Sequence, residues 1–374
     1  MKKILLFLLV LVLIKSGYAQ GTYLRTAMPF LRIAPDAHSS AMGETGAATS
    51  PDLNSLYWNN AKIAFLEGDY GFSASYVPWL SQIKSGISNL YFTGYRKLDS
   101  KQGIAMSVNY FTMGKVNFFD EVGNDIGRYN PNEFSIELAY SRQLSPSMSL
   151  GLTGKFLHSD LANGQNSSDG ALLATSDYAF DLGWYYENTT NNSNRLSYGI
   201  ILSNIGPKIK QNTGQRGQYL PMNLRIGTQL HFQGVLNSVN ISLDVNKLLL
   251  PTPPVYKKDS AGNSTGEILK GEDPDKSIPR AIIGSFSDAP GGISEQIRQF
   301  TAGIGFEYDF AEKFFLRAGY HYENLKIGDM RYMTTGFGYA GNSLRLDMSY
   351  ILPSGIYSPY KNTFRMTIGF NIIQ

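Results

Sequence analysis

The feature that most constrains this chain is a two-residue alternation of apolar and polar side chains, which recurs from Tyr70 to the C-terminus. In the segment 344–352, for example, Leu344, Leu346 and Met348 alternate with Arg345 and Asp347. Successive side chains of a β-strand point to opposite faces, so each segment predicts a strand with one apolar face. Most segments are about nine or ten residues long, the length that a tilted strand needs to cross a bilayer, whereas strands of soluble sheets have about five or six.

We count about fourteen such segments, and single-chain bacterial barrels use even numbers of strands. The predicted strands cover residues 70–79, 87–95, 103–111, 133–141, 148–157, 178–186, 196–202, 220–232, 239–250, 300–308, 314–322, 332–339, 344–352 and 364–372. The sequence therefore predicts an all-β fold in which residues 70–374 form a transmembrane antiparallel β-barrel. A soluble β-sandwich is the alternative, since its strands also alternate apolar and polar residues.

The lengths of the predicted connections favour the barrel, because barrels join their strands by short periplasmic turns and longer extracellular loops in alternation. Connections such as 142–147 and 233–238 are short, whereas the long ones are 112–132, 158–178, 203–219 and 251–299. Within the longest loop, residues 251–278 are rich in Pro and charged residues and are expected to be mobile and solvated. The helix-like spacing of Ile293, Ile297 and Phe300 predicts an ordered segment, either a cap on the barrel mouth, a partner surface or a loop anchor.

The first nineteen residues predict a cleaved signal peptide. Lys2 and Lys3 precede an apolar run from Ile4 to Ile14, which is followed by small residues ending at Ala19. The apolar run is well short of the roughly twenty residues that a spanning helix needs. Export to the bacterial outer membrane is the expected localisation.

Residues 20–69 do not alternate and are rich in Ala, Gly, Ser and Asn, so they cannot form a lipid-facing strand. We expect them to fold inside the lumen as a plug, where backbone must pack closely. A disordered periplasmic tail is the alternative, but the apolar content of 53–65 disfavours it. The candidate plug residues are Pro35, Asp36, Met42, Gly43, Trp58, Asn59 and Asn60.

The sequence offers no signature of catalysis, metal binding or nucleic-acid binding. It has no Cys, its four His residues (His38, His158, His231 and His321) lack metal-ligand spacing, and no nucleophile-elbow motif occurs. A net charge of +3 in 374 residues is too small to argue for nucleic acid. No enzyme activity, metal or cofactor is expected.

Charged residues of both signs fall on the polar faces of the predicted strands. They are expected to pair across the lumen and hold the plug. In the alternative, the lumen Arg residues clamp the carboxylate of a fatty acid. The residues are Glu137, Lys155, Asp181, Arg225, Asp244, Arg317, Arg345, Asp347 and Arg365.

Several motifs together resemble the PorV family of outer-membrane proteins of the type IX secretion system. They are Leu31–Ala37, Met42–Gly43, Gly46–Asp52, Tyr57–Asn59, Tyr76–Leu80 and Ser285–Gly292. That family is similar in turn to the FadL class of fourteen-stranded, plugged barrels that pass long-chain fatty acids. One departure is Asn59-Asn60-Ala61, where those relatives carry Asn-Pro-Ala, and the missing proline is expected to relax the backbone there.

The resemblance implies a carrier that binds the C-terminal signal domains of secreted proteins at a large translocon channel protein. It would then pass them to a surface attachment complex that contains a sortase-like protease. Outer-membrane lipid or lipopolysaccharide is a further expected partner, and a FadL-like transporter of hydrophobic molecules is the alternative function. The candidate partner-binding residues in the outer loops are Trp79, Leu80, Phe286, Asp288, Ala289, Pro290, Gly291, Gly292, Ile293 and Ile297.

Overall fold

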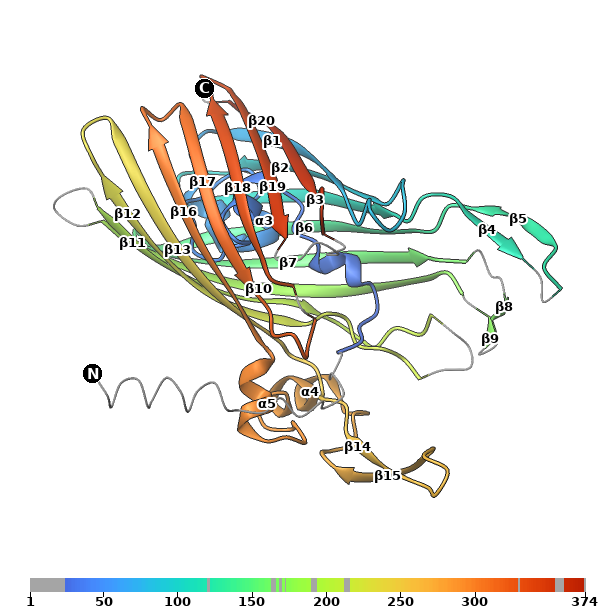
Figure 1. Ribbon diagram of the computed structural model, residues 1–374. Helices are drawn as coiled ribbons and strands as arrows, with labels where there is room; N and C mark the ends of the chain where they lie inside the picture. Colours follow the sequence, from blue (N-terminus) through green and yellow to red (C-terminus); the bar gives the residue numbers. More distant parts are fainter. Residues whose placement is uncertain are drawn as a thin grey trace, which may run out of the picture.

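The computed structural model describes residues 24–119, 122–162, 166–167, 170–171, 173–189, 194–211, 216–328, 330–353 and 360–372. The predicted signal peptide, 1–19, lies outside these residues. In the described chain, fourteen antiparallel strands close into one barrel in which each strand pairs with the next and β20 pairs with β1 (Figure 1). These strands are β1 (Tyr70–Pro78), β2 (Ser88–Lys97), β3 (Gln102–Thr112), β6 (Asn132–Ser145), β7 (Met148–Asp160), β10 (Thr175–Thr189), β11 (Arg195–Ile205), β12 (Asn223–Gln233), β13 (Asn237–Leu248), β16 (Phe300–Phe310), β17 (Phe314–Tyr322), β18 (Tyr332–Ala340), β19 (Leu344–Pro353) and β20 (Phe364–Ile372).

The predicted barrel is confirmed, and the differences concern strand ends. β6, β7 and β10 have 14, 13 and 15 residues and so extend the wall beyond the predicted segments. β12 begins at Asn223 rather than at residue 220. Pro221 lies between these positions and has no N–H group with which to extend the ladder.

The two faces of the strands differ as the alternation predicts. On β13, Ile241 and Leu243 are 38% and 45% exposed, whereas Asn240 and Ser242, which alternate with them, are buried. The same outward row of exposed Leu, Ile, Phe and Met residues recurs around the barrel. A soluble sandwich would bury such a row, so that alternative is wrong and the outward face is the lipid-facing one. No helix of the described chain is long and apolar enough to cross a bilayer.

The two rims of the barrel differ in their connections. At one rim, which we call the short-turn rim, tight turns such as 311–313 join the strands. The opposite, long-loop rim carries three hairpins and two short helices (Figure 1). The hairpins are β4 (Val116–Phe119) with β5 (Asp125–Tyr129), β8 (Asn166–Ser167) with β9 (Gly170–Ala171), and β14 (Val255–Lys258) with β15 (Ser264–Lys270), and the helices are α4 (Ile278–Gly284) and α5 (Ile293–Arg298).

The region 251–278, expected to be mobile and solvated, contains regular structure. It contains the β14–β15 hairpin, in which Val255 pairs with Lys270 and Lys258 pairs with Ser264. Every residue of the two strands is exposed, so the charged side chains that suggested mobility are accommodated on a hairpin surrounded by solvent.

Residues 24–69 lie inside the barrel as a plug made of short helices. These are η1 (Pro29–Arg32), α2 (Ala37–Ala41), α3 (Ser55–Trp58) and η2 (Asn60–Phe65). Met28, Met42, Trp58 and Ile63 are fully buried, so this segment is no disordered tail.

Gly43 shows how closely the plug approaches the wall. Its φ is +68°, and a Cβ built on it would lie 2.6 Å from the carbonyl oxygens of both Ile304 and Tyr320. Backbone touches backbone there, so any larger residue would clash.

Candidate functional site

The candidate site comprises the plug, a cavity above it and the long-loop rim, and it is described here from the plug outward. Asp36 organises the plug: its carboxylate accepts hydrogen bonds from the Ser39 N–H at 2.9 Å and from the Trp58 indole at 2.5 Å. The first bond caps the N-terminus of α2. Burial and the neighbouring Asp52 raise the pKa of Asp36. One carboxylate thus ties two plug helices together.

An ion-pair network joins the plug to the strands β16, β17 and β19. The His38 imidazole lies 2.7 Å from Asp52 through Nδ1 and 3.1 Å from Glu307 through Nε2. Glu307 also accepts from Arg317 at 2.6 Å, and Arg317 donates to Asp347 at 2.7 Å. All five side chains are buried, so each charge depends on its partners.

Burial and Arg317 lower the pKa of His38, but Glu307 and Asp52 more than offset both, so its pKa lies above the usual value. Burial raises the pKa of Asp52, but the hydrogen bond and charge of His38 outweigh burial, and the pKa is lowered. Both directions favour a charged His38–Asp52 pair inside the lumen.

A second set of contacts fixes the Glu44–Ala47 segment of the plug. Asp244 of β13 accepts hydrogen bonds from the N–H groups of Gly46 and Ala47 at 2.8 and 3.0 Å. Arg225 of β12 donates to the same carboxylate and to the Glu44 carbonyl, at 3.2 and 2.7 Å. The polar lumen residues therefore pair and hold the plug, as expected.

The Asn59-Asn60 pair, which stands where the sequence departs from the resemblance, bonds both the plug and the wall. The Asn59 side chain donates to the carbonyls of Ala47 and Trp184 and accepts from the Ala61 N–H. Asn60 donates to the Thr153 hydroxyl at 2.7 Å. Hydrogen bonds from two amide side chains thus connect this part of the plug to β7 and β10.

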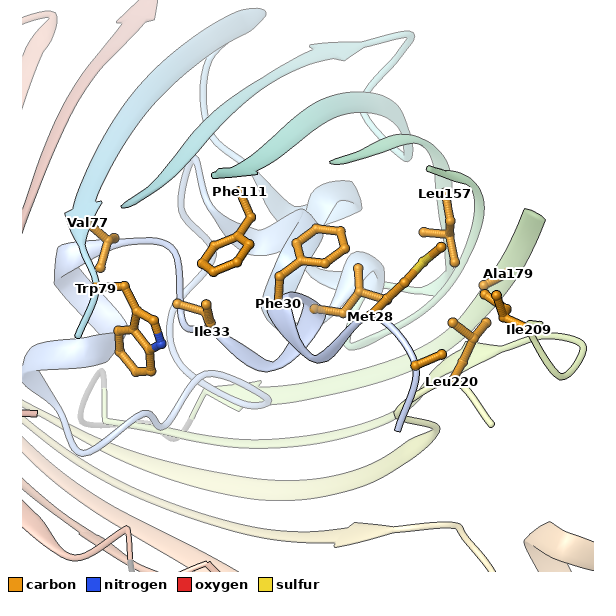
Figure 2. Close-up of a cluster of buried hydrophobic side chains, with 12 residues drawn as sticks. Met28, Phe30, Ile33, Val77, Trp79, Phe111, Leu157, Ala179, Ile209 and Leu220 are labelled. Carbon is orange, nitrogen blue, oxygen red and sulfur yellow. The ribbon is translucent and has the colours of Figure 1, made fainter. Parts of the chain in front are cut away.

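Above the plug, on the side of the long-loop rim, lies a cavity of about 420 Å³. Phe30, Leu31 and Ile33 of the plug line this cavity. The ring of Phe30 is stacked on the ring of Phe111 of β3, with 6.2 Å between the ring centroids (Figure 2). Trp79 and Ile33 lie on one side of Phe30 (Figure 2). The cavity has room for a small apolar molecule.

The cations that line this cavity all have carboxylate partners. Arg32 lies 3.5 Å from Glu323, Lys155 lies 2.8 Å from Asp181, and Arg225 pairs with Asp244 as described above. Each of these charges already has a partner of opposite sign, so the arrangement favours an uncharged ligand.

The structure divides the expected partner-binding residues into three groups. Trp79 is 8% exposed and Leu80 packs against the same buried cluster, so both lie toward the cavity and not on the outer surface. Asp288 is buried and bonds the Thr252 N–H and hydroxyl at 3.0 and 2.7 Å, which makes it a loop anchor, with Ala289 buried beside it. The exposed residues are Phe286, Gly291, Gly292, Ile293 and Ile297, and Pro290 is half-buried.

The expected plug residues are all brought together in the lumen: Pro35, Asp36, Met42, Gly43, Trp58, Asn59 and Asn60 are buried. Among the described residues, no group of three or more His, Cys, Asp or Glu side chains has the arrangement of a metal site.

Sequence reasoning missed the cavity, although the inward rows of the strands carry a signal for it. The inward row of β1 runs from Gly71, Ser73 and Ser75 to Val77 and Trp79. Phe111 ends the inward row of β3 in the same way. A change from small or polar to apolar residues at the same end of two inward rows indicates an apolar chamber at that end.

A sequence model described as type IX secretion system protein PorV matches residues 17–255. The chain belongs to the PorV family. None of the curated proteins matches its sequence.

Solved structures that resemble this chain share little of its sequence. The toluene transporter TodX of P. putida is 12% identical, with 91% of this chain and 99% of that chain covered and a TM-score of 0.51. A TodX variant described as a monoaromatic hydrocarbon channel is 13% identical, with 90% and 97% covered and a TM-score of 0.52. A FadL homologue of Pseudomonas aeruginosa is 10% identical, with 94% and 99% covered and a TM-score of 0.45. At these identities the likeness to the two TodX structures concerns the fold alone.

Proposed function

We propose that this PorV-family chain is a non-enzymatic shuttle of the type IX secretion system. It binds the C-terminal signal domains of secreted proteins at the large translocon channel and delivers them to the surface attachment complex with its sortase-like protease. The family match over residues 17–255 carries this proposal. The plug supports it, because a lumen filled by a segment bonded to the surrounding wall leaves the rim as the place for a protein partner.

We place the contact with cargo at the hairpins of the long-loop rim, which faces the cell surface in this proposal. β4–β5 and β14–β15 project from the rim (Figure 1), and Phe119 and Leu269 on them are 59% and 61% exposed. A two-stranded hairpin also presents unpaired strand edges, to which a further strand can add through backbone hydrogen bonds. Long loops on a rigid scaffold are suited to binding of this kind.

The β14–β15 hairpin can be excised with little disturbance. Val255 pairs with Lys270, and a Cβ built on Gly271 would lie 3.2 Å from the Cα of Pro254, so the two ends already meet. We expect a chain that lacks 255–270, with Pro254 joined to Gly271, to assemble as a heat-modifiable barrel but to display less cargo on the cell surface. The matched control is Lys257→Ala with Glu267→Ala, which removes an exposed ion pair of 3.1 Å and keeps the hairpin.

Normal display in the excised variant would contradict the placement at this hairpin. Normal display in cells that lack the chain altogether would contradict the shuttle function itself.

A second candidate is the passage of small hydrophobic molecules, and the apolar cavity favours it. The molecule would be uncharged, since the cations that line the cavity are paired. The TodX structures, described as a toluene transporter and a monoaromatic hydrocarbon channel, make toluene a suitable probe. Toluene uptake that depends on the chain and is lost in Phe111→Glu would support this function, and uptake that is equal with and without the chain would contradict it.

A further inference from the structure

The long-loop end of the barrel wall carries a row of outward-facing side chains that is covered instead of exposed. Leu202 of β11 pairs with Leu224 of β12, Leu224 with Lys247 of β13, and Lys247 with Phe300 of β16. Directly opposed residues lie on the same face of a sheet. The next row along the strands, Ile200, Ile226 and Val245, is 36%, 48% and 38% exposed and belongs to the lipid-facing band. Residues two apart share a face, so the covered row is outward as well.

The segment that covers this row is residues 278–299, which contain α4 and α5 and which we call the cap. Leu202 and Leu224 pack with Ile278, Ala281 and Ile282 of α4 in one apolar cluster. The two helices lie at the ends of β13 and β16 (Figure 1). The expectation of a cap on the barrel mouth is therefore incomplete, because the segment also folds over the outside of the wall.

Lys247 explains why this part of the wall needs a cover. Its side chain is 1% exposed, its ammonium donates to Gln299 Oε1 at 2.7 Å, and it lies over the rings of Phe286 and Phe300. A lysine on the lipid-facing side is costly when hydrocarbon surrounds it. The cap supplies the polar partner and the aromatic faces that stabilise the charge.

The cap exposes four large apolar side chains, together with Arg280, Ser287 and Ser294. Ile293 and Ile297, one turn apart on α5, are 79% and 64% exposed. Ile283 in the last turn of α4 and Phe286, two residues after the helix, are 75% and 46% exposed. Single exposed apolar residues are common, but this group stands beside a lipid-facing band.

We propose that the cap is a membrane foot, and that Ile283, Phe286, Ile293 and Ile297 insert into the outer leaflet next to β11–β16. Continuity with the lipid-facing band carries the proposal. Two residues of strand span about 7 Å, so the cap begins that far from side chains that touch acyl chains. Short helices with apolar residues on the outside are suited to the boundary between headgroups and acyl chains. A protein partner on the same flank is the competing occupant.

The chain has no Cys, so single-cysteine variants can carry an environment-sensitive fluorophore without background labelling. Ile293→Cys and Ile297→Cys would be measured in the full chain, in phosphatidylcholine vesicles that contain lipids with a nitroxide on the acyl chain. Ile226→Cys, in the lipid-facing band, serves as the lipid reference. Leu269→Cys, on the β14–β15 hairpin, serves as the aqueous reference.

We expect loss of fluorescence at positions 293 and 297 comparable with that at Ile226→Cys, together with a blue-shifted emission. Labels that behave like Leu269→Cys would overturn the proposal. Labels that are not quenched by lipid in vesicles but are shielded from water in native outer membranes would also overturn it, because a protein would then cover the cap.

Discussion

The plug and the cap are both packed against the same barrel, one inside and one outside, and they are held by different forces. The plug is held by buried charges and hydrogen bonds, such as the His38–Glu307 contact and the hydrogen bond from the Gly46 N–H to Asp244. The cap is held mainly by apolar contacts with Leu202 and Leu224, and it leaves other apolar side chains exposed. An alternating strand offers a polar face and an apolar face, and each attached segment has the composition that its face requires.

This difference predicts that substitutions inside the lumen lower the free energy of unfolding strongly, whereas substitutions on the cap surface lower it little. The largest effect is expected for Arg317→Met, which removes the guanidinium shared by two buried carboxylates and leaves His38 as the charged partner of Glu307 and Arg345 as that of Asp347. Breaking a buried ion pair from one side costs about 3–5 kcal/mol. The measurement is the free energy of unfolding by denaturant in detergent micelles. Arg345→Met is the matched control, because its side chain is 30% exposed and pairs with Asp347 at 3.0 Å, and equal losses in the two variants would contradict the comparison.

Close backbone packing gives the next largest effect. A Cβ at position 319 would lie 2.1 Å from the Gly43 nitrogen, whereas a Cβ at position 154 would lie 4.0 Å from the nearest atom, on the Phe180 ring. We expect Gly319→Ala to lose about 1–3 kcal/mol of unfolding free energy through overpacking, and Gly154→Ala to lose little. Similar losses of unfolding free energy in the two variants would show that the plug backbone packs less closely against β17 than described.

The pH dependence of plug attachment should follow His38, whose surroundings are Asp52, Glu307 and Arg317. Its pKa is raised in the folded chain, so its contribution to stability is complete below the unfolded value of 6.5 and is lost as the pH rises through the folded pKa. The wild-type barrel should therefore lose stability from neutral toward alkaline pH, and His38→Gln should lose less over the same range. Unfolding curves at matched pH values test this, and parallel pH profiles would refute it.

The smallest effect is expected on the outer surface of the cap. Ile297→Ser should change the unfolding free energy in detergent by no more than about 0.5 kcal/mol, because the side chain is 64% exposed. Ile282→Ser should cost more, since Ile282 packs in the cluster with Leu224. A larger loss for Ile297→Ser than for Ile282→Ser would mean that the orientation of the cap is reversed.

The barrel could be predicted from the sequence because the two-residue period is a local property. Each strand, such as Leu344–Pro353, shows its two faces without reference to its neighbours. The plug was predictable in position from its small residues, but its contacts were not. Gly43 contacts Ile304, and His38 pairs with Glu307, so these contacts are between residues that are far apart in the sequence.

The outer loops were predicted least well. Residues 255–270 form a hairpin in a segment whose charges suggested disorder, because pairing between Val255 and Lys270 depends on the register and not on composition. The contact of the cap with Leu202 and Leu224 could not be predicted either, because both residues have the pattern of ordinary lipid-facing positions. Trp79 was expected among the outer partner-binding residues and lies toward the cavity because it continues the inward row of β1.

The most direct test of the shuttle function is affinity purification of the intact chain from outer membranes in mild detergent, followed by identification of the proteins that elute with it. We predict that C-terminal signal domains of secreted proteins and a very large channel protein co-elute with the wild-type chain, and that the signal domains are reduced in the variant that lacks 255–270. An eluate that contains the chain with a small hydrophobic molecule, and neither of those proteins, would contradict the account.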